Sequence, residues 1–132
     1  MKKFNQYKPK KTSAKSFKPK EQKRNSRKMG YDSDWDKYRF RFLHHNPKCY
    51  CCGRISTVVD HIKAHKGDMD LFRNTHNHMP LCKHHHDTIT GKFDRKEIPD
   101  LEGKLRYINQ CRDKYKTTIK IKILPSYIKF TR

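Results

Sequence analysis

The chain has few of the residues that build a large hydrophobic core. Only 33% of its 132 residues are hydrophobic, and no stretch approaches the roughly 20 consecutive apolar residues that a membrane span needs. The N-terminus also lacks the apolar segment of a signal peptide, so the sequence predicts a cytoplasmic protein with no membrane partner. This length predicts one small domain, and a domain with so little apolar material usually needs an additional source of stability, for which a metal ion is the candidate here.

Acidic residues are also scarce, and the resulting charge predicts a polyanionic partner. Thirteen Asp and Glu side chains stand against thirty-three Lys and Arg, which gives a formal net charge of +20 and a pI near 10.0. This balance favours nucleic acid over a membrane surface. Residues 1–30 carry twelve of the basic side chains, a single acid and no hydrophobic periodicity. We expect them to form a disordered basic tail that contributes to nucleic-acid affinity.

The cysteines are odd in number, and their spacing does not suggest a disulfide framework. Four of the five lie with all nine histidines in the segment 44–86. Within it, Cys49 and Cys52 form a C-x-x-C pair, and Cys82 and His85 form a C-x-x-H pair. Each pair places two donors on one tight turn, so together they predict a tetrahedral structural zinc site.

The spacing leaves two of these ligand positions open. Cys51 adjoins Cys52, and His84 adjoins His85, so either neighbour could supply the ligand instead. Gly53 favours Cys52, because a glycine after the second cysteine allows the backbone to turn with a positive φ.

An aromatic stripe at helical spacing follows the basic segment. Ser33 begins a capping-box pattern, and Pro47 ends the run, which predicts a helix over residues 34–45. The stripe is predicted to face the core, whereas Arg39 and Arg41 are candidates for contact with phosphate or remain solvated. The stripe consists of Trp35, Tyr38 and Phe42.

Short apolar runs predict a small sheet and a further helix. Residues 56–60 are β-branched and predict a strand, with residues 79–81 as its partner. The intervening residues 63–75 form a long loop of a kind that is commonly functional. A short helix is predicted over residues 82–90, with Gly91 at its C-terminal cap.

Amphipathic patterns continue to the C-terminus. An apolar stripe predicts a helix over residues 101–115, and Cys111 within it is predicted to be a buried core thiol rather than a metal ligand. Alternating Ile and Lys over residues 119–123 predict a half-exposed strand before Pro125.

A second set of polar residues predicts catalysis. Asp60 and His61 end the first predicted strand, Asn77 precedes the second, and His86 directly follows the second zinc pair. A carboxylate and an imidazole can hold a divalent ion with open positions for water and a phosphate oxygen, while another imidazole activates water. The set predicts cleavage of phosphodiester bonds.

The order of these motifs resembles the HNH endonucleases of the ββα-metal superfamily, in particular small phage-encoded enzymes associated with DNA packaging. The matching strings are C-x-x-C-G, V-D-H-I, H-x-G-D, L-F and N-x-M-x-L-C-x-x-H-H, all within residues 49–86. The resemblance implies an α+β fold, a small zinc-stabilised ββα-metal domain with flanking helices. It divides the chain into a tail (1–30), a nuclease domain with a lead-in helix (31–95) and a C-terminal helix and strand extension packed on the same domain (96–132).

The resemblance also implies a role for each site residue. His61 would be the general base for water, and Asp60 and His86 would bind a catalytic divalent ion, Mg²⁺, Mn²⁺ or similar. Asn77 would orient the His61 ring through its amide oxygen. Structural Zn²⁺ would be held by Cys49, Cys52, Cys82 and His85.

The chain departs from the family at Ile89, where members of this type often carry a lysine. Loss of that lysine removes a phosphate contact, for which Lys92 could compensate. His65 is a candidate for contact with nucleic acid or for a role in loop structure. The remaining histidines are expected at the surface: His44, His45, His76, His78 and His84.

Two functions of different classes follow. The first is a metal-dependent endonuclease that hydrolyses DNA phosphodiester bonds by nicking or double-strand cleavage, in the host cytoplasm if the protein is phage-encoded. The alternative is a non-catalytic, zinc-stabilised nucleic-acid-binding or packaging-assembly module, for which the charge and the zinc pairs would suffice. Phage terminase or portal proteins are candidate partners in either case. The joint presence of Asp60, His61, Asn77 and His86 favours the endonuclease.

Overall fold

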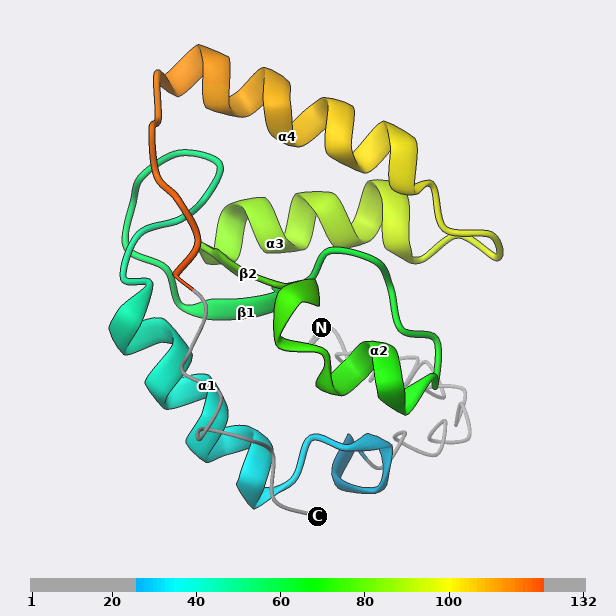
Figure 1. Ribbon diagram of the computed structural model, residues 1–132. Helices are drawn as coiled ribbons and strands as arrows, with labels where there is room; N and C mark the ends of the chain where they lie inside the picture. Colours follow the sequence, from blue (N-terminus) through cyan, green and yellow to red (C-terminus); the bar gives the residue numbers. More distant parts are fainter. Residues whose placement is uncertain (1–25, 123–132) are drawn as a thin grey trace, which may run out of the picture.

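A pair of antiparallel strands, β1 (Val58–His61) and β2 (His78–Leu81), lies at the centre of the fold. The computed structural model describes residues 26–122 (Figure 1). Val58 pairs with Leu81 and His61 pairs with His78, so the predicted pairing is confirmed. β1 begins two residues later than predicted.

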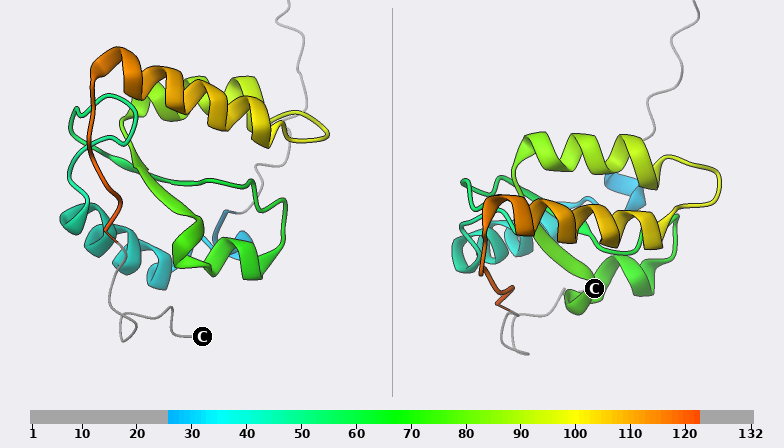
Figure 2. Two further views of the ribbon diagram at one scale, coloured as in Figure 1. Left: turned by 45° about the horizontal axis from the view of Figure 1, so that its top comes forward. Right: turned by 90° about the horizontal axis from the view of Figure 1, so that it is seen from above.

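Helices lie in two groups on opposite sides of this sheet (Figures 1 and 2). On one side the helices pack on the sheet through a cluster of aromatic side chains, and on the other side through a cluster that contains the cysteines. The fold of residues 26–122 is therefore α+β, with a two-stranded sheet and four α-helices. No helix in this part of the chain is long and apolar enough to cross a membrane. The two groups are α1 (Ser33–His45) with α2 (Met69–Arg73), and α3 (Lys83–Ile89) with α4 (Leu101–Tyr115).

The chain takes a defined conformation before the predicted end of the tail at residue 30. Ser26–Met29 form a 3₁₀ helix, and Arg27 donates a hydrogen bond to Asp36 on α1 over 2.9 Å. Gly30 follows with φ of 99° and lies against the side chain of Phe72. The tail prediction is thus wrong for residues 26–30, and residues 1–25 lie outside the described range.

Helix α1 is capped one residue earlier than predicted. The carboxylate of Asp32, not the hydroxyl of Ser33, accepts a hydrogen bond from the amide of Trp35 over 3.0 Å. Asp and Ser are both strong N-cap residues, so the sequence allowed either. The aromatic stripe is buried as predicted, and it packs with Val59 and Phe72.

The long loop predicted between the strands contains a helix. Asp68 accepts hydrogen bonds from the amides of Asp70 (2.9 Å) and Leu71 (3.2 Å), which caps the single-turn helix α2. Phe72 anchors this turn in the aromatic cluster. The prediction of an irregular loop is therefore wrong for Met69–Arg73.

Helix α3 continues beyond its predicted end. A π-helical segment, Thr90–Asp94, extends it, and the amide of Arg95 donates to the Thr90 carbonyl over 3.0 Å. Gly91 therefore lies inside the segment, and its predicted role as a cap is wrong. Phe93 packs on Tyr107 of α4, which helps to hold this extension in place.

Helix α4 has the predicted bounds, and Cys111 on it is buried as predicted. The strand predicted over residues 119–123 is absent from its described part, residues 119–122. The amide side chain of Asn46 instead holds this segment by bonding the Lys122 amide (2.6 Å) and carbonyl (2.9 Å). Ile121 packs against both core clusters, so the alternation of Ile and Lys indicates which side chains are buried, although the segment has no partner strand among the described residues.

Candidate metal centre and catalytic site

Four side chains converge at the end of the sheet nearest α3. One ligand atom from each of Cys49, Cys52, Cys82 and His85 lies within 4.8 Å of all the others. The Sγ atoms of Cys52 and Cys82 are 3.8 Å apart, and a tetrahedral zinc ion with Zn–S bonds of about 2.3 Å separates two sulfurs by about 3.8 Å. The group could hold a structural metal ion such as zinc. Cys52 and His85 belong to it, and Cys51 and His84 do not, so the preferred spacing is confirmed.

Backbone geometry prepares the first pair for a metal ion. Gly53 has φ of 76°, as the turn requires, and its amide donates to the Cys49 carbonyl over 2.9 Å. The Cys51 thiol and several backbone amides donate to the Cys49 sulfur, and they lower the Cys49 pKa to about 4. Burial raises the pKa of Cys52 to about 12. A divalent ion would favour the thiolate at both positions.

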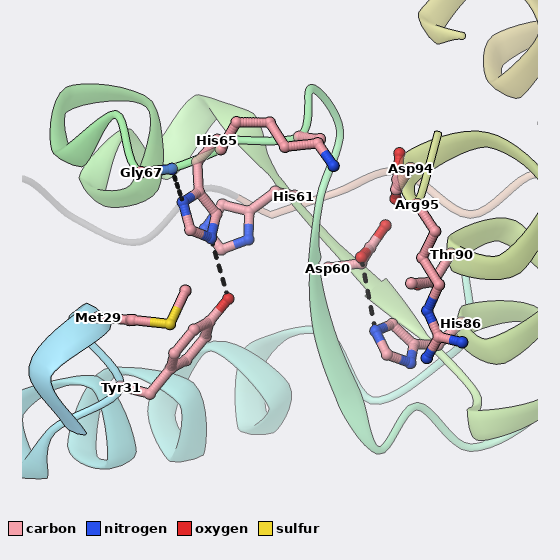
Figure 3. Close-up of a pocket in the computed structure, with 12 residues that line it drawn as sticks. Met29, Tyr31, Asp60, His61, His65, Gly67, His86, Thr90, Asp94 and Arg95 are labelled. Atoms are coloured by element: carbon pink, nitrogen blue, oxygen red, sulfur yellow. Dashed lines mark hydrogen bonds and ion pairs between the residues drawn. The ribbon is translucent and has the colours of Figure 1, made fainter. Parts of the chain in front are cut away.

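Adjacent residues of β1 serve opposite sides of the sheet. Because side chains alternate along a strand, Asp60 points toward α3 and His61 toward α1 and α2 (Figure 3). Both line a cavity of about 450 Å³, together with His86. The predicted ion ligands and the predicted base therefore meet at one cavity.

Asp60 and His86 have a geometry that suits a shared cation. Asp60 Oδ1 lies 3.7 Å from His86 Nε2, and two ligands at about 2.1 Å from one ion are about 3 to 4 Å apart. His86 Nδ1 faces Asp87 at 3.4 Å, which leaves Nε2 as the lone-pair nitrogen. Asp60 is buried, and its Oδ2 lies 3.2 Å from the Lys104 ammonium, which leaves Oδ1 for a cation. This donor set, a carboxylate oxygen and an imidazole nitrogen, fits a divalent ion.

Burial and neighbouring charges act against each other on Asp60. Burial raises the pKa of its carboxyl group, and the nearby carboxylate of Asp94 adds to this effect. The ammonium of Lys104 and the ring of His86 lower the pKa. A cation between Asp60 and His86 would favour the ionised carboxylate further.

The His61 ring is held with one nitrogen available as a base. Its Nε2 lies 3.1 Å from the carbonyl oxygen of Phe72. A carbonyl can only accept, so Nε2 carries the proton and Nδ1 has the lone pair. The Trp35 ring stacks on it with centroids 5.5 Å apart. Burial, the largest cause, lowers the His61 pKa to about 3, so the ring is neutral near pH 7.

Asn77 does not orient that ring, and the predicted role is wrong. Its Oδ1 accepts from the Lys63 amide over 2.9 Å, and its Nδ2 donates to the carbonyls of Lys63 (3.0 Å) and Leu71 (3.2 Å). The Phe72 carbonyl fixes the tautomer of His61 instead. Asn77 ties the two ends of the inter-strand segment together, and in this way it supports the position of Phe72.

Of the four predicted nucleic-acid contacts, His65 alone lines the cavity. Arg39 is exposed and donates to the Thr57 carbonyl over 2.6 Å, and Arg41 is exposed on the same helix. Lys92 lies 5.2 Å from the centroid of the Tyr107 ring, and it does not take the place suggested for it at the cavity. Ile89, at the position where the resembled family often carries a lysine, is fully buried in the core.

Several residues of the site were not found from the sequence. His78 was expected at the surface but is buried, with its Nδ1 2.6 Å from the Tyr38 hydroxyl. Lys104 is fully buried beside Asp60. A signal existed, because Lys104 precedes Ile108 and Cys111 at helical spacing, and the buried stripe of α4 runs through these three residues. The charged and aromatic residues of the cavity lining that the sequence does not predict are Tyr31, Lys66, Asp94 and Arg95.

Comparison with known proteins gives no relative: no family model, curated protein or solved structure matches the chain. The function therefore has to be inferred from the chemistry of the two sites. The Cys₃His group can stabilise the fold, and the cavity at Asp60, His61 and His86 has the groups needed to bind a cation and to accept a proton.

Proposed function

We propose that the protein is a metal-dependent endonuclease of the HNH type, with a ββα-metal domain that hydrolyses DNA phosphodiester bonds. The observation that carries this proposal is the meeting of Asp60, His61 and His86 at one cavity. The three residues come from β1 and from α3, the helix that directly follows the second strand. The Cys₃His group joins the segment before β1 to the start of α3 and would hold structural zinc.

Each residue has a part that follows from its contacts. Asp60 Oδ1 and His86 Nε2 would hold the divalent ion, which stabilises negative charge on the phosphate and on the leaving oxygen when bound. His61 Nδ1 would accept the proton of the attacking water. The negative charge of an approaching phosphate raises the low pKa of this ring and makes it a better base.

The mouth of the cavity supplies contacts for a phosphate backbone. Lys66 and Arg95 line it and carry positive charge. His65 Nδ1 accepts from the Gly67 amide over 3.1 Å, so its Nε2 donates to the Tyr31 hydroxyl, also over 3.1 Å. This arrangement leaves the Tyr31 proton available for a phosphate oxygen. The net charge of +20 favours nucleic acid as the substrate.

A plasmid-cleavage assay with matched variants tests the proposal. Wild-type protein is expected to nick or cut DNA with Mg²⁺ or Mn²⁺ and not with EDTA. His61→Ala is expected to slow cleavage by about 100-fold or more while zinc content, fold and DNA binding are kept, because only the proton acceptor is lost. His76→Ala is the matched control, since His76 is exposed and lies outside the cavity lining.

Two results would contradict this function. Robust cleavage by a folded His61→Ala protein would refute the assignment of the base. Absence of cleavage by wild type on both DNA and RNA, with every divalent ion tried, would favour the zinc-stabilised binding module. The charge of +20 and the Cys₃His group are sufficient for that alternative.

A further inference from the structure

Lys104 is a buried lysine at the centre of the domain. It lies on α4 with none of its surface exposed, and lysine is almost never fully buried unless it is paired. Its ammonium donates to the His61 carbonyl over 2.6 Å and to both Asp94 oxygens, at 2.9 and 3.1 Å. It also lies 3.2 Å from Asp60 Oδ2.

These contacts link Lys104 to both Asp60, the proposed cation ligand, and His61, the proposed base. Asp60 and His61 are consecutive on β1, and the Lys104 ammonium contacts the side chain of the first and the backbone of the second. With Oδ2 of Asp60 beside the ammonium, Oδ1 is the oxygen that faces His86. Lys104 is absent from the cavity lining, so it acts behind the site and does not touch a substrate.

We propose that Lys104 is a positioning residue of the cation site, which it shapes by fixing the Asp60 carboxylate with Oδ1 toward His86. The proposal rests on the proposed function, because it assumes that Asp60 and His86 bind a divalent ion. Groups that hold metal ligands in place typically change metal affinity by about 10- to 100-fold when removed.

A simpler role for Lys104 would be to neutralise Asp94, to which it is closer. The double variant Lys104→Met/Asp94→Asn separates the two roles. In the wild type, the charges of Asp60, Lys104 and Asp94 sum to one negative charge, and in the double variant Asp60 alone carries one negative charge. The net formal charge near the cation is thus unchanged, whereas the ammonium contacts with Asp60 and with the His61 carbonyl are lost. Removing both members of the buried pair also avoids the severe cost of leaving one charge unpaired.

Direct titration of Mn²⁺ into full-length, zinc-loaded protein tests the proposal without any need for DNA. Wild type is expected to bind one Mn²⁺ in addition to zinc, and Asp60→Asn is expected to abolish that binding. Lys104→Met and the double variant are expected to bind Mn²⁺ about 10- to 100-fold more weakly with zinc content unchanged. Arg106→Met is the matched control, because Arg106 is exposed on the same helix.

The outcomes distinguish this inference from the function on which it rests. Wild-type affinity in the folded double variant would overturn the positioning role and would leave the cation site intact. If Lys104→Met does not fold, the double variant decides the question. If wild type binds no Mn²⁺ that depends on Asp60, the proposed cation site does not exist. The proposed function and the positioning role of Lys104 are then both refuted.

Discussion

The buried ring of His78 makes the stability of the fold depend on pH. Only 1% of its surface is exposed, and burial, the main cause, lowers its pKa from 6.5 to about 4. Its Nε2 lies 2.8 Å from the Phe72 carbonyl, so Nε2 carries the proton and Nδ1 accepts from the Tyr38 hydroxyl. The folded state therefore holds this ring neutral where the unfolded chain would protonate it.

The sign follows from proton binding in the two states. Between the folded pKa of about 4 and the unfolded value of 6.5, the unfolded chain binds more protons at this position. The free energy of unfolding therefore falls as the pH is lowered through this window. The full pKa difference corresponds to about 3 kcal/mol, of which about 1 kcal/mol is lost between about pH 7.5 and about pH 5.5.

Urea unfolding of zinc-loaded protein, followed by the fluorescence of Trp35, measures this effect. Trp35 is the single tryptophan of the chain, and its ring contacts the His78 ring with centroids 5.5 Å apart. His78→Gln cannot titrate, so its unfolding free energy should fall by about 1 kcal/mol less than that of wild type between about pH 7.5 and about pH 5.5. His61 is retained in both proteins, and because burial is the largest cause of its low pKa, its ring stays neutral over this pH range in each.

His76→Gln serves as the control, because His76 is exposed and its removal should leave the pH dependence as in wild type. Zinc content is measured at each pH, since protonation of the ligands releases zinc at low pH. Equal pH dependence for wild type and His78→Gln, at equal zinc content, would refute the reasoning.

Two further predictions concern the metal centre and the basic N-terminus. Cys82→Ser should lose the zinc and unfold the segment around it, whereas Cys111→Ser, which is outside the ligand group, should retain one zinc per chain. Elemental analysis measures the zinc content, and circular dichroism measures the fold. A folded, zinc-loaded Cys82→Ser protein would contradict this prediction. Deletion of residues 1–25 removes ten Lys and Arg side chains but no cavity residue, so DNA affinity should fall and depend less steeply on salt. An unchanged slope of log K against log salt would show that these residues do not contact phosphate.

Features that depend on neighbours in the sequence could be predicted. The place of Cys49 and Cys52 in the candidate metal-binding group follows from their spacing and from one glycine, and the bounds of α4 follow from its periodicity and its N-cap at Asp100. Helix α2 could not be predicted in this way, because five residues give too little pattern. The Asp68 carboxylate caps the N-terminus of α2, and Phe72 is buried in a cluster whose other residues are distant in the sequence.

Contacts between distant segments account for the remaining errors. Lys104 and the His61 carbonyl are 43 positions apart in the chain, and no local pattern reports that contact. The strand predicted near Ile121 had the correct alternation of burial, but a side chain, Asn46, satisfies the backbone in place of a neighbouring strand. The predicted partner of Asn77 is wrong because an amide can bond to a backbone as readily as to an imidazole.

The placement of Asp60 and His61 in adjacent positions on β1 has a consequence for the rigidity of the candidate site. The two residues belong to different packed halves of the molecule, one beside the cysteine cluster and the other within the aromatic cluster. Their Cα atoms are nevertheless separated by a single peptide bond, which fixes them about 3.8 Å apart. Thermal motion of one half against the other therefore changes the angle between the two side chains far more than their spacing. Substitutions in either half can thus alter how well one group is supported, while the Cα–Cα spacing of the two residues stays set by covalent bonds.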